Sequence, residues 1–129
     1  MHFIFGGRAM GKLDWAMGLA PGASVCDLGT SALDDAGGAV IINNVHLLVK
    51  ALAAEGRDAV SYFQDHMGLL EEKIVIGDEV GSGVVPMEPF ERLWRDETGR
   101  VYQLLTRHAR RVTRLWAGIP QELKREGDR

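Results

Sequence analysis

Residues 2–13, HFIFGGRAMGKL, combine an apolar run, a glycine-rich turn and a lysine, and this order indicates the class of fold. Residues 2–5 are an apolar run that predicts a buried strand, and the pattern predicts a helix over 12–19. Between them, Gly6 begins the pattern G-x-x-x-x-G-K, which ends at Lys12. A strand, a glycine-rich turn and a helix in this order are the context of a phosphate-binding loop. The alternative interpretation is a plain glycine turn that joins a strand to a helix.

The phosphate-binding interpretation has a physical basis in the glycines and in the helix that follows. Glycine lets the backbone turn sharply with successive N–H groups pointing inward, and a helix N-terminus attracts anions. Lys12 would reach the terminal phosphates of a nucleotide. The candidate nucleotide-binding residues are Gly6, Gly7, Arg8, Ala9, Met10, Gly11, Lys12 and Leu13.

Two positions depart from what such a loop uses to hold Mg²⁺. Leu13 stands where Ser or Thr would supply a hydroxyl ligand, and its side chain cannot bind a metal. The strand predicted over residues 39–42 is followed by Asn43-Asn44, where kinase sites of this class place an Asp. Mg²⁺ prefers carboxylate oxygen, so the sequence offers no firm metal ligand here. An N-cap for the next helix is an equally good interpretation of Asn43-Asn44.

The rest of the chain alternates short strands with helices. Further strands are predicted over residues 24–28, 39–42, 74–76 and 112–117, and helices over 45–54, 60–70 and 87–110. This alternation predicts an α/β fold with a mostly parallel sheet of about five strands and helices on both faces. Ligands bind beyond the carboxyl ends of such strands, which are here residues 6–7, 43–44 and 77–79.

Composition limits the class of protein. The chain has 129 residues, of which 46% are hydrophobic and 26% charged, values typical of one folded domain and not of a disordered chain. A net charge of −3 predicts no nucleic-acid partner, and no apolar run reaches the roughly 20 residues that cross a bilayer. Cys26 is the single cysteine, which excludes an internal disulfide and favours a cytoplasmic location. Residues 1–120 are predicted to form one domain, and residues 121–129 a polar, fraying C-terminal tail.

Seven arginines lie between residues 92 and 114, which makes this segment locally positive. Arg95 and Arg100 are candidates for stabilising phosphate charge. The alternative is a solvated helix face with ion pairs at i,i+4 spacing, namely Glu91–Arg95 and Asp96–Arg100. We favour the solvated face for most of these arginines.

Residues 74–86, IVIGDEVGSGVVP, carry the most specific similarity to a known family. An apolar strand, a polar residue with Glu-Val-Gly, and then Gly-(Ile/Val)-Val-Pro resemble the adenosylcobinamide kinase / adenosylcobinamide-phosphate guanylyltransferase family. Residues 95–103, RDETGRVYQ, and 115–120, LWAGIP, resemble the next helix and the final strand of that family. The phosphate-binding loop is similar to the family's Thr-Gly-Gly-Ala/Arg-x-Ser-Gly-Lys-Ser. The similarity covers residues 1–20 and about 38–120.

The resemblance implies a P-loop NTPase-like (RecA-like) fold, GTP or ATP with Mg²⁺ as cofactors, and a homo-oligomer, which is a trimer in the family. It also implies phosphoryl transfer to the aminopropanol hydroxyl of a corrinoid. Glu79 is then the retained acid, which faces phosphate or Mg²⁺ through water, or is a structural carboxylate that binds loop N–H groups. Asp78 stands where the family usually has Asn, so its carboxylate can replace the one absent at Asn43. Lys12, Asp78 and Glu79 are the candidate catalytic residues.

An expected segment is missing from the chain. The family carries an additional stretch, with the histidine that takes up the guanylyl group, where this sequence passes from Asp35 almost directly to Gly37. The resemblance therefore implies that guanylyl transfer is lost. His46 lies in an apolar helical pattern and is interpreted as a packed or surface residue. Two functions stay open: a shortened cobalamin-biosynthesis kinase that binds nucleotide, or a catalytically inactive homologue that binds nucleotide or a corrinoid.

Overall fold

The computed structural model describes residues 1–81 and 88–127. Its strands are β1 (His2–Gly6), β2 (Val25–Asp27), β3 (Ile41–Asn43), β4 (Ile74–Asp78), β5 (Arg111–Trp116) and β6 (Ile119–Arg125). Its helices are α1 (Lys12–Leu19), α2 (Val45–Ala54), α3 (Ala59–Asp65), α4 (Met67–Leu70) and α5 (Pro89–His108), with a short 3-10 turn at Leu33–Asp35. Within these described residues, no helix is long and apolar enough to span a membrane.

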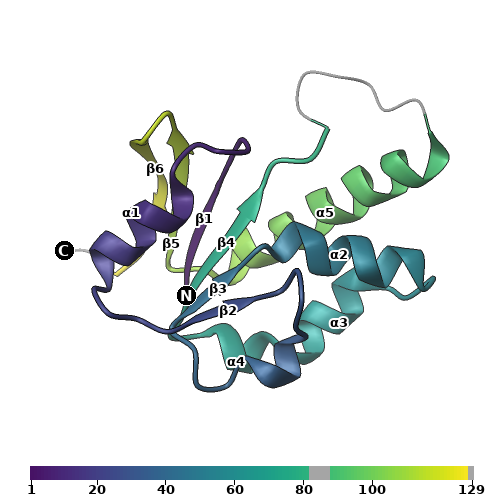
Figure 1. Ribbon diagram of the computed structural model, residues 1–129, viewed down its shortest axis with the longest axis horizontal. Coiled ribbons are helices and arrows are strands. Elements are labelled where there is room, and N and C mark those ends of the chain that lie inside the picture. Colours follow the sequence, from purple (N-terminus) through teal and green to yellow (C-terminus); the bar gives the residue numbers. More distant parts are fainter. Residues whose placement is uncertain (82–87, 128–129) are drawn as a thin grey trace.

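The six strands form one sheet in the order β2-β3-β4-β1-β5-β6. β1 lies in the middle, parallel to β4 and β5, with Phe3 opposite both Val75 and Val112. β2 and β3 continue the parallel arrangement, whereas β6 runs antiparallel to β5. α1 covers one face of the sheet, and α2, α3 and α5 lie together on the other (Figure 1). The predicted α/β fold, with a mostly parallel sheet and helices on both faces, is confirmed.

Alternating side chains of the central strands fill two cores. Phe3 and Val75 point into the larger core under α2 and α5. Ile4 and Ile76 point the opposite way and pack with Ala16 of α1. Strands that are buried on both faces are continuous apolar runs in the sequence, which is why residues 2–5 and 74–76 were predictable. The two cores fix β1 and β4 side by side, so their carboxyl ends meet at one edge.

The C-terminal residues differ from the predicted fraying tail. Ile119–Arg125 form β6, which makes the sheet six-stranded. Nearly every β6 side chain is exposed, so the strand lacks the alternating apolar pattern that predicts strands. Its order comes from main-chain pairing with β5 and from two side-chain hydrogen bonds. Arg111 Nε donates to the carboxylate of Glu122 at 2.7 Å, and Lys124 Nζ donates to the carbonyl oxygen of Thr106 at 2.8 Å.

The single helix predicted over residues 60–70 is divided into α3 and α4 at His66. The His66 Nδ1 atom lies 2.7 Å from the carbonyl oxygen of Tyr62, and its Nε2 atom lies 2.9 Å from Asp34. In a continuous helix that carbonyl would accept from the main-chain N–H of His66. The imidazole ring takes this place, and the main-chain N–H bonds to Phe63 instead.

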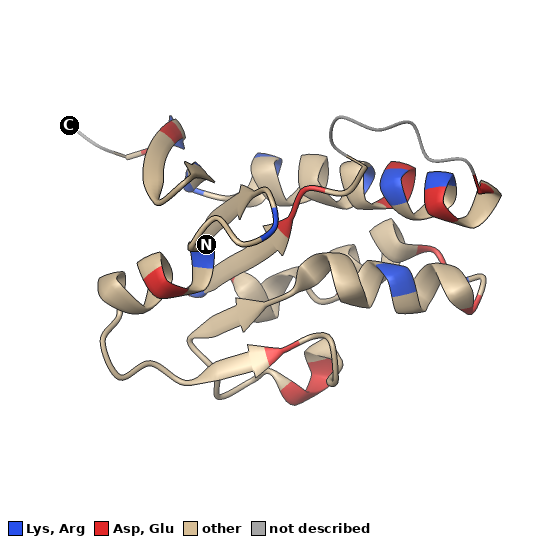
Figure 2. Cartoon of the chain, turned by 45° about the horizontal axis from the view of Figure 1, so that its top comes forward, with Lys and Arg blue, Asp and Glu red and all other residues tan. Residues whose placement is uncertain are grey.

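Ion pairs along α5 form at spacings other than the predicted i,i+4. Arg95 pairs with its neighbour Asp96 at 3.2 Å. Arg100 pairs with Glu97 at 3.5 Å, and its side chain is 61% exposed. Acidic and basic residues interleave along this helix (Figure 2). Arg100 therefore belongs to a solvated helix face, as the alternative interpretation of these arginines predicted.

We predict that His2 makes the stability of the fold depend on pH. Burial, followed by the charge of Arg111, lowers the pKa of His2 from 6.5 to about 4, and its Nε2 atom lies 2.8 Å from Thr113 Oγ1. Between about pH 6.5 and pH 4, the His2 imidazole is protonated in the unfolded chain and neutral in the folded chain. The free energy of unfolding therefore falls as the pH falls below about 6.5. Urea unfolding between pH 7 and pH 5 should show a shallower loss of stability for His2→Gln than for the natural chain. Parallel losses in the two proteins would contradict the prediction, and His108→Gln, at an exposed histidine, is the matched control.

Candidate functional site

The loop between β1 and α1 borders a cavity at the carboxyl edge of the sheet. Ala9 and Gly11 adopt left-handed backbone conformations, with φ of 59° and 84°, and α1 begins directly afterwards at Lys12. The volume of this first cavity is about 210 Å³. Its lining residues are Ala9, Met10, Gly11, Lys12, Leu13, Asp14, Asn43, Asn44 and Asp78. The structure thus brings most of the predicted loop together with the ends of β3 and β4.

The loop is fastened to β5 on its other side. A Cβ atom at Gly6 would collide with the carbonyl group of Leu115, so only glycine fits at this close approach. The N–H group of Gly118 donates to the carbonyl oxygen of Met10 at 3.1 Å. Gly6 therefore allows the close packing of the loop against β5, and it is not among the residues that line the cavity.

Lys12 is held inside the first cavity and is only 6% exposed. Its Nζ atom donates to the carbonyl oxygen of Gly7 at 2.6 Å and pairs with Asp78 Oδ1 at 2.8 Å. A buried ammonium group needs such partners, because an uncompensated buried charge costs several kcal/mol. The charge that would meet phosphate is therefore already compensated by a carboxylate of this chain.

Asp78 is held through its main chain as well as its carboxylate. Tyr102 Oη donates to the carbonyl oxygen of Asp78 at 2.6 Å, and the N–H group of Asp78 donates to His46 Nδ1 at 3.1 Å. Because Nδ1 accepts, the ring proton is on Nε2, which lies 3.4 Å from Asp78 Oδ2. Burial lowers the pKa of His46, against the opposing charge of Asp78, and so favours this neutral ring. A Cβ atom at Gly77 would collide with the Tyr102 hydroxyl, so glycine is required there too.

A second cavity, of about 480 Å³, adjoins the first. Its lining residues are Arg8, Asn44, His46, Leu47, Asp78, Glu79, Val80, Gly81 and Trp94. The indole N–H of Trp94 donates to the carbonyl oxygen of His46 at 2.8 Å, which fixes α5 against the start of α2. Asn44 and Asp78 line both cavities. Arg8, predicted as part of the phosphate-binding loop, belongs to this second cavity.

The sequence suggested phosphate, Mg²⁺ or loop N–H groups as partners of the Glu79 carboxylate, and the structure shows an arginine instead. Its carboxylate forms a two-armed ion pair with Arg114 of β5, at 2.7 and 3.3 Å. The guanidinium group also lies 5.6 Å from the ring centroid of Trp116. Glu79 is therefore bound to a cation and joins β4 to β5, while its main-chain N–H donates to Gly6.

The residues at the first cavity do not fit a Mg²⁺ ion held by the protein. Leu13 supplies no oxygen, Asn43 supplies only an amide, and the carboxylate of Asp78 faces Lys12. The other carboxylate of the lining, Asp14, belongs to an exposed residue of α1, and one such group does not hold a metal ion by itself. Over residues 1–81 and 88–127, no group of three or more His, Cys, Asp or Glu side chains could hold a metal ion. This donor set disagrees with the Mg²⁺ that the resemblance implies.

Asn44 occupies the N-cap position of α2 without capping it through its side chain. Its backbone is left-handed, with φ of 65°, and its amide donates to Asp27 Oδ1 at 2.8 Å. The same oxygen accepts from the N–H group of Gly29 at 2.8 Å. Asn44 therefore ties the end of β3 to the end of β2, and its position places it between the two cavities.

The arginines of α5 line neither cavity. The stem of Arg95 packs against Gly81 at the second cavity, and its guanidinium group is paired with Asp96. Arg100 is directed to solvent, as described above. Residues 82–86 of the segment that resembles the family lie outside the described part of the chain.

Four residues of the site were not among the predicted ones: His46, Trp94, Tyr102 and Arg114. The position of His46, three residues after the end of a strand, was the available signal, but its apolar neighbours favoured a packed residue. Arg114 interrupts an apolar strand, which is a signal for a functional or paired charge. Trp94 and Tyr102 contribute through one N–H and one O–H group, and helical spacing does not distinguish these from core aromatics.

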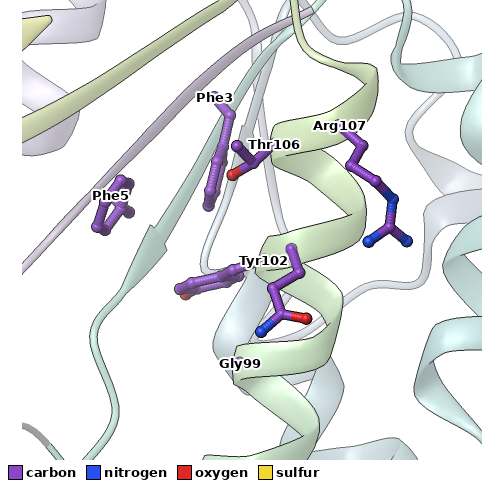
Figure 3. A pocket seen from close by; sticks show the side chains of 7 residues that line it. Phe3, Phe5, Gly99, Tyr102, Thr106 and Arg107 are labelled. Atoms are coloured by element: carbon purple, nitrogen blue, oxygen red, sulfur yellow. The ribbon is translucent and has the colours of Figure 1, made fainter. Parts of the chain in front are cut away.

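An apolar hollow of about 430 Å³ lies apart from both cavities, between β1 and α5 (Figure 3). Its lining residues are Phe3, Phe5, Gly99, Tyr102, Gln103, Thr106 and Arg107. The rings of Phe3 and Tyr102 meet edge to face, with centroids 5.0 Å apart. Among the described residues, this lining contains no carboxylate or imidazole group.

Comparison with known proteins agrees with this architecture. The sequence model of the family described as cobinamide kinase / cobinamide phosphate guanyltransferase matches residues 30–123, which is more than half of the chain. The matched residues begin after the phosphate-binding loop, so the interpretation of the loop depends on its own sequence and geometry. The bifunctional adenosylcobalamin biosynthesis protein CobP of Pseudomonas aeruginosa is 40% identical over 53 residues, which are 41% of this chain and 31% of that protein. The matched stretch thus spans about a third of the curated relative. The chain belongs to the cobinamide kinase / cobinamide phosphate guanyltransferase family, and its α/β fold is of the P-loop NTPase type.

Proposed function

We propose that this chain binds the phosphates of GTP or ATP in the first cavity and transfers a phosphoryl group to an alcohol in the second. The observation that carries the proposal is the pair of adjoining cavities that share Asp78 and Asn44. One cavity contains a lysine, left-handed loop residues and the start of a helix, all of which favour phosphate. The other has room for a polar acceptor beside the same carboxylate.

The transfer would proceed by direct displacement. The acceptor oxygen forms a bond to the γ-phosphorus while the bond to the bridging oxygen breaks, leaving the nucleoside diphosphate. Asp78 is the base that both cavities share, and it takes the hydroxyl proton. Lys12 and the loop N–H groups compensate the phosphate charge, and Arg8 does so from the second cavity. The membership in the family suggests the hydroxyl of a corrinoid as the acceptor, and guanylyl transfer is not part of the proposal.

A second candidate is a catalytically inactive homologue that binds a nucleotide or a corrinoid. It is favoured by Leu13 and Asn43, since both replace groups that would hold Mg²⁺. The existing ion pair of Lys12 favours it too, because the lysine must leave Asp78 before it can serve a phosphate. Under both candidates, a cytoplasmic location and a trimeric assembly stay predictions.

One prediction of the proposed function concerns nucleotide binding. A ligand at about a hundred times its Kd adds roughly 2.7 kcal/mol to stability, which raises the unfolding midpoint of a chain of this size by about 10 °C. Thermal unfolding with GTP or ATP should show such a shift in the natural chain and not in Lys12→Ala. Lys124→Ala, which removes a lysine from the edge strand β6, should keep the shift. A shift that persists in Lys12→Ala would exclude the loop as the phosphate site.

The second prediction separates the two candidates. Incubation with cobinamide and a nucleotide labelled at its γ-phosphate should yield labelled cobinamide phosphate, and Lys12→Ala should abolish this product. Because binding and transfer are measured on the same preparation, each candidate has its own outcome. Nucleotide binding without any labelled product would contradict the kinase and support the inactive homologue.

A further inference from the structure

We infer that Asp78 is a built-in competitor of phosphate for Lys12, so that a bound phosphate displaces this carboxylate from the first cavity toward the second. The inference rests on the proposed function, since it concerns the same phosphate site. It assigns Asp78 a role opposite to that of a metal-holding acid. A metal-holding carboxylate strengthens nucleotide binding, whereas a competing carboxylate weakens it.

The contacts of Lys12 carry the first step of the argument. Its Nζ atom has two oxygen partners in the described structure, the Gly7 carbonyl and Asp78 Oδ1, at 2.6 and 2.8 Å. The side chain is almost fully buried, so little water reaches its charge. A phosphate that binds Lys12 must therefore take the place of one of these oxygens. The carboxylate is the one that leaves, because a second negative charge beside phosphate in a poorly solvated cavity is unfavourable.

The way Asp78 is anchored carries the second step. Its N–H and carbonyl groups are fixed by His46 Nδ1 and Tyr102 Oη, so the strand end stays where it is. The carboxylate can therefore leave Lys12 by side-chain rotation alone. Its Oδ2 atom already lies 3.4 Å from the Nε2–H group of His46, which lines the second cavity, so a partner on that side is present before Oδ1 leaves Lys12. A hydroxyl or amide group of a ligand in that cavity would donate to the displaced carboxylate as well.

The test is the affinity for tripolyphosphate, measured by calorimetry in EDTA so that no metal contributes. Asp78→Asn removes the competing charge and keeps a side chain of the same shape. It should bind tripolyphosphate at least about tenfold more tightly than the natural chain, which is the lower end of the effect of one neighbouring charge. Asp65→Asn changes the net charge equally at an exposed position on α3, and its affinity should equal that of the natural chain.

Equal or weaker binding by Asp78→Asn would overturn the inference while leaving the phosphate site intact. If neither protein binds tripolyphosphate, the proposed phosphate site is wrong and the inference falls with it. Should Asp78→Asn not fold, a crystal structure of the natural chain with tripolyphosphate decides the matter. Lys12 bound to phosphate, with Asp78 turned to His46, supports the inference, and an unbroken Lys12–Asp78 pair contradicts it.

Discussion

The ion pair between Lys12 and Asp78 is the interaction on which the rest of the site depends. It joins the start of α1 to the end of β4, and so connects the phosphate-binding loop to the strand beside it. Lys12 is only 6% exposed, and a buried ammonium group without a partner costs several kcal/mol, so the pair stabilises the fold as well as the site. Around it, His46, Tyr102 and Trp94 fix the main chain of Asp78 and the beginning of α2.

The position of the negative charge differs from what the sequence led us to expect. Kinase sites of this class place a carboxylate at the position of residue 43, at the end of β3. The family resemblance implies an amide at residue 78, at the end of β4. Here the amide is at Asn43 and the carboxylate at Asp78, and both line the same cavity. Compared with that expectation, the carboxylate lies on the neighbouring strand, where it contacts Lys12 and not a metal position. Leu13 also makes this cavity less suited to a metal ion, since it has no hydroxyl oxygen where the loop pattern expects one.

Much of the fold could be predicted from the sequence because the central strands are buried on both faces. Their apolar runs, and the helical spacing of residues 45–54, locate the sheet and the helices to within a few residues. β6 could not be found in this way, because its side chains are exposed and its order comes from main-chain pairing with β5. The division at His66 depends on a contact with Asp34, which is distant in the sequence.

Several individual residues of the site could be predicted from the sequence, but the contacts between them could not. Spacing identified the loop, and the strand ends identified Asp78 and Glu79. Which cation each acid meets depends on the sheet order, since β1 lies between β4 and β5 and brings Lys12 to one acid and Arg114 near the other. His46 was interpreted as a packed residue, and it is indeed buried, but its ring also holds Asp78. Short-range sequence patterns contain no information about such contacts between distant segments.

Exchanging the strand-end residues Asn43 and Asp78 would distinguish a phosphate site that works without metal from one that needs it. In the double variant Asn43→Asp/Asp78→Asn, the carboxylate is placed at the end of β3 and Lys12 loses its ion pair. Calorimetry of GTP binding, in EDTA and in Mg²⁺, should show equal affinities for the natural chain under the two conditions. For the double variant, it should show tighter binding in Mg²⁺. A natural chain that binds GTP only in Mg²⁺ would contradict the account, because it would mean that the present residues support a metal site after all.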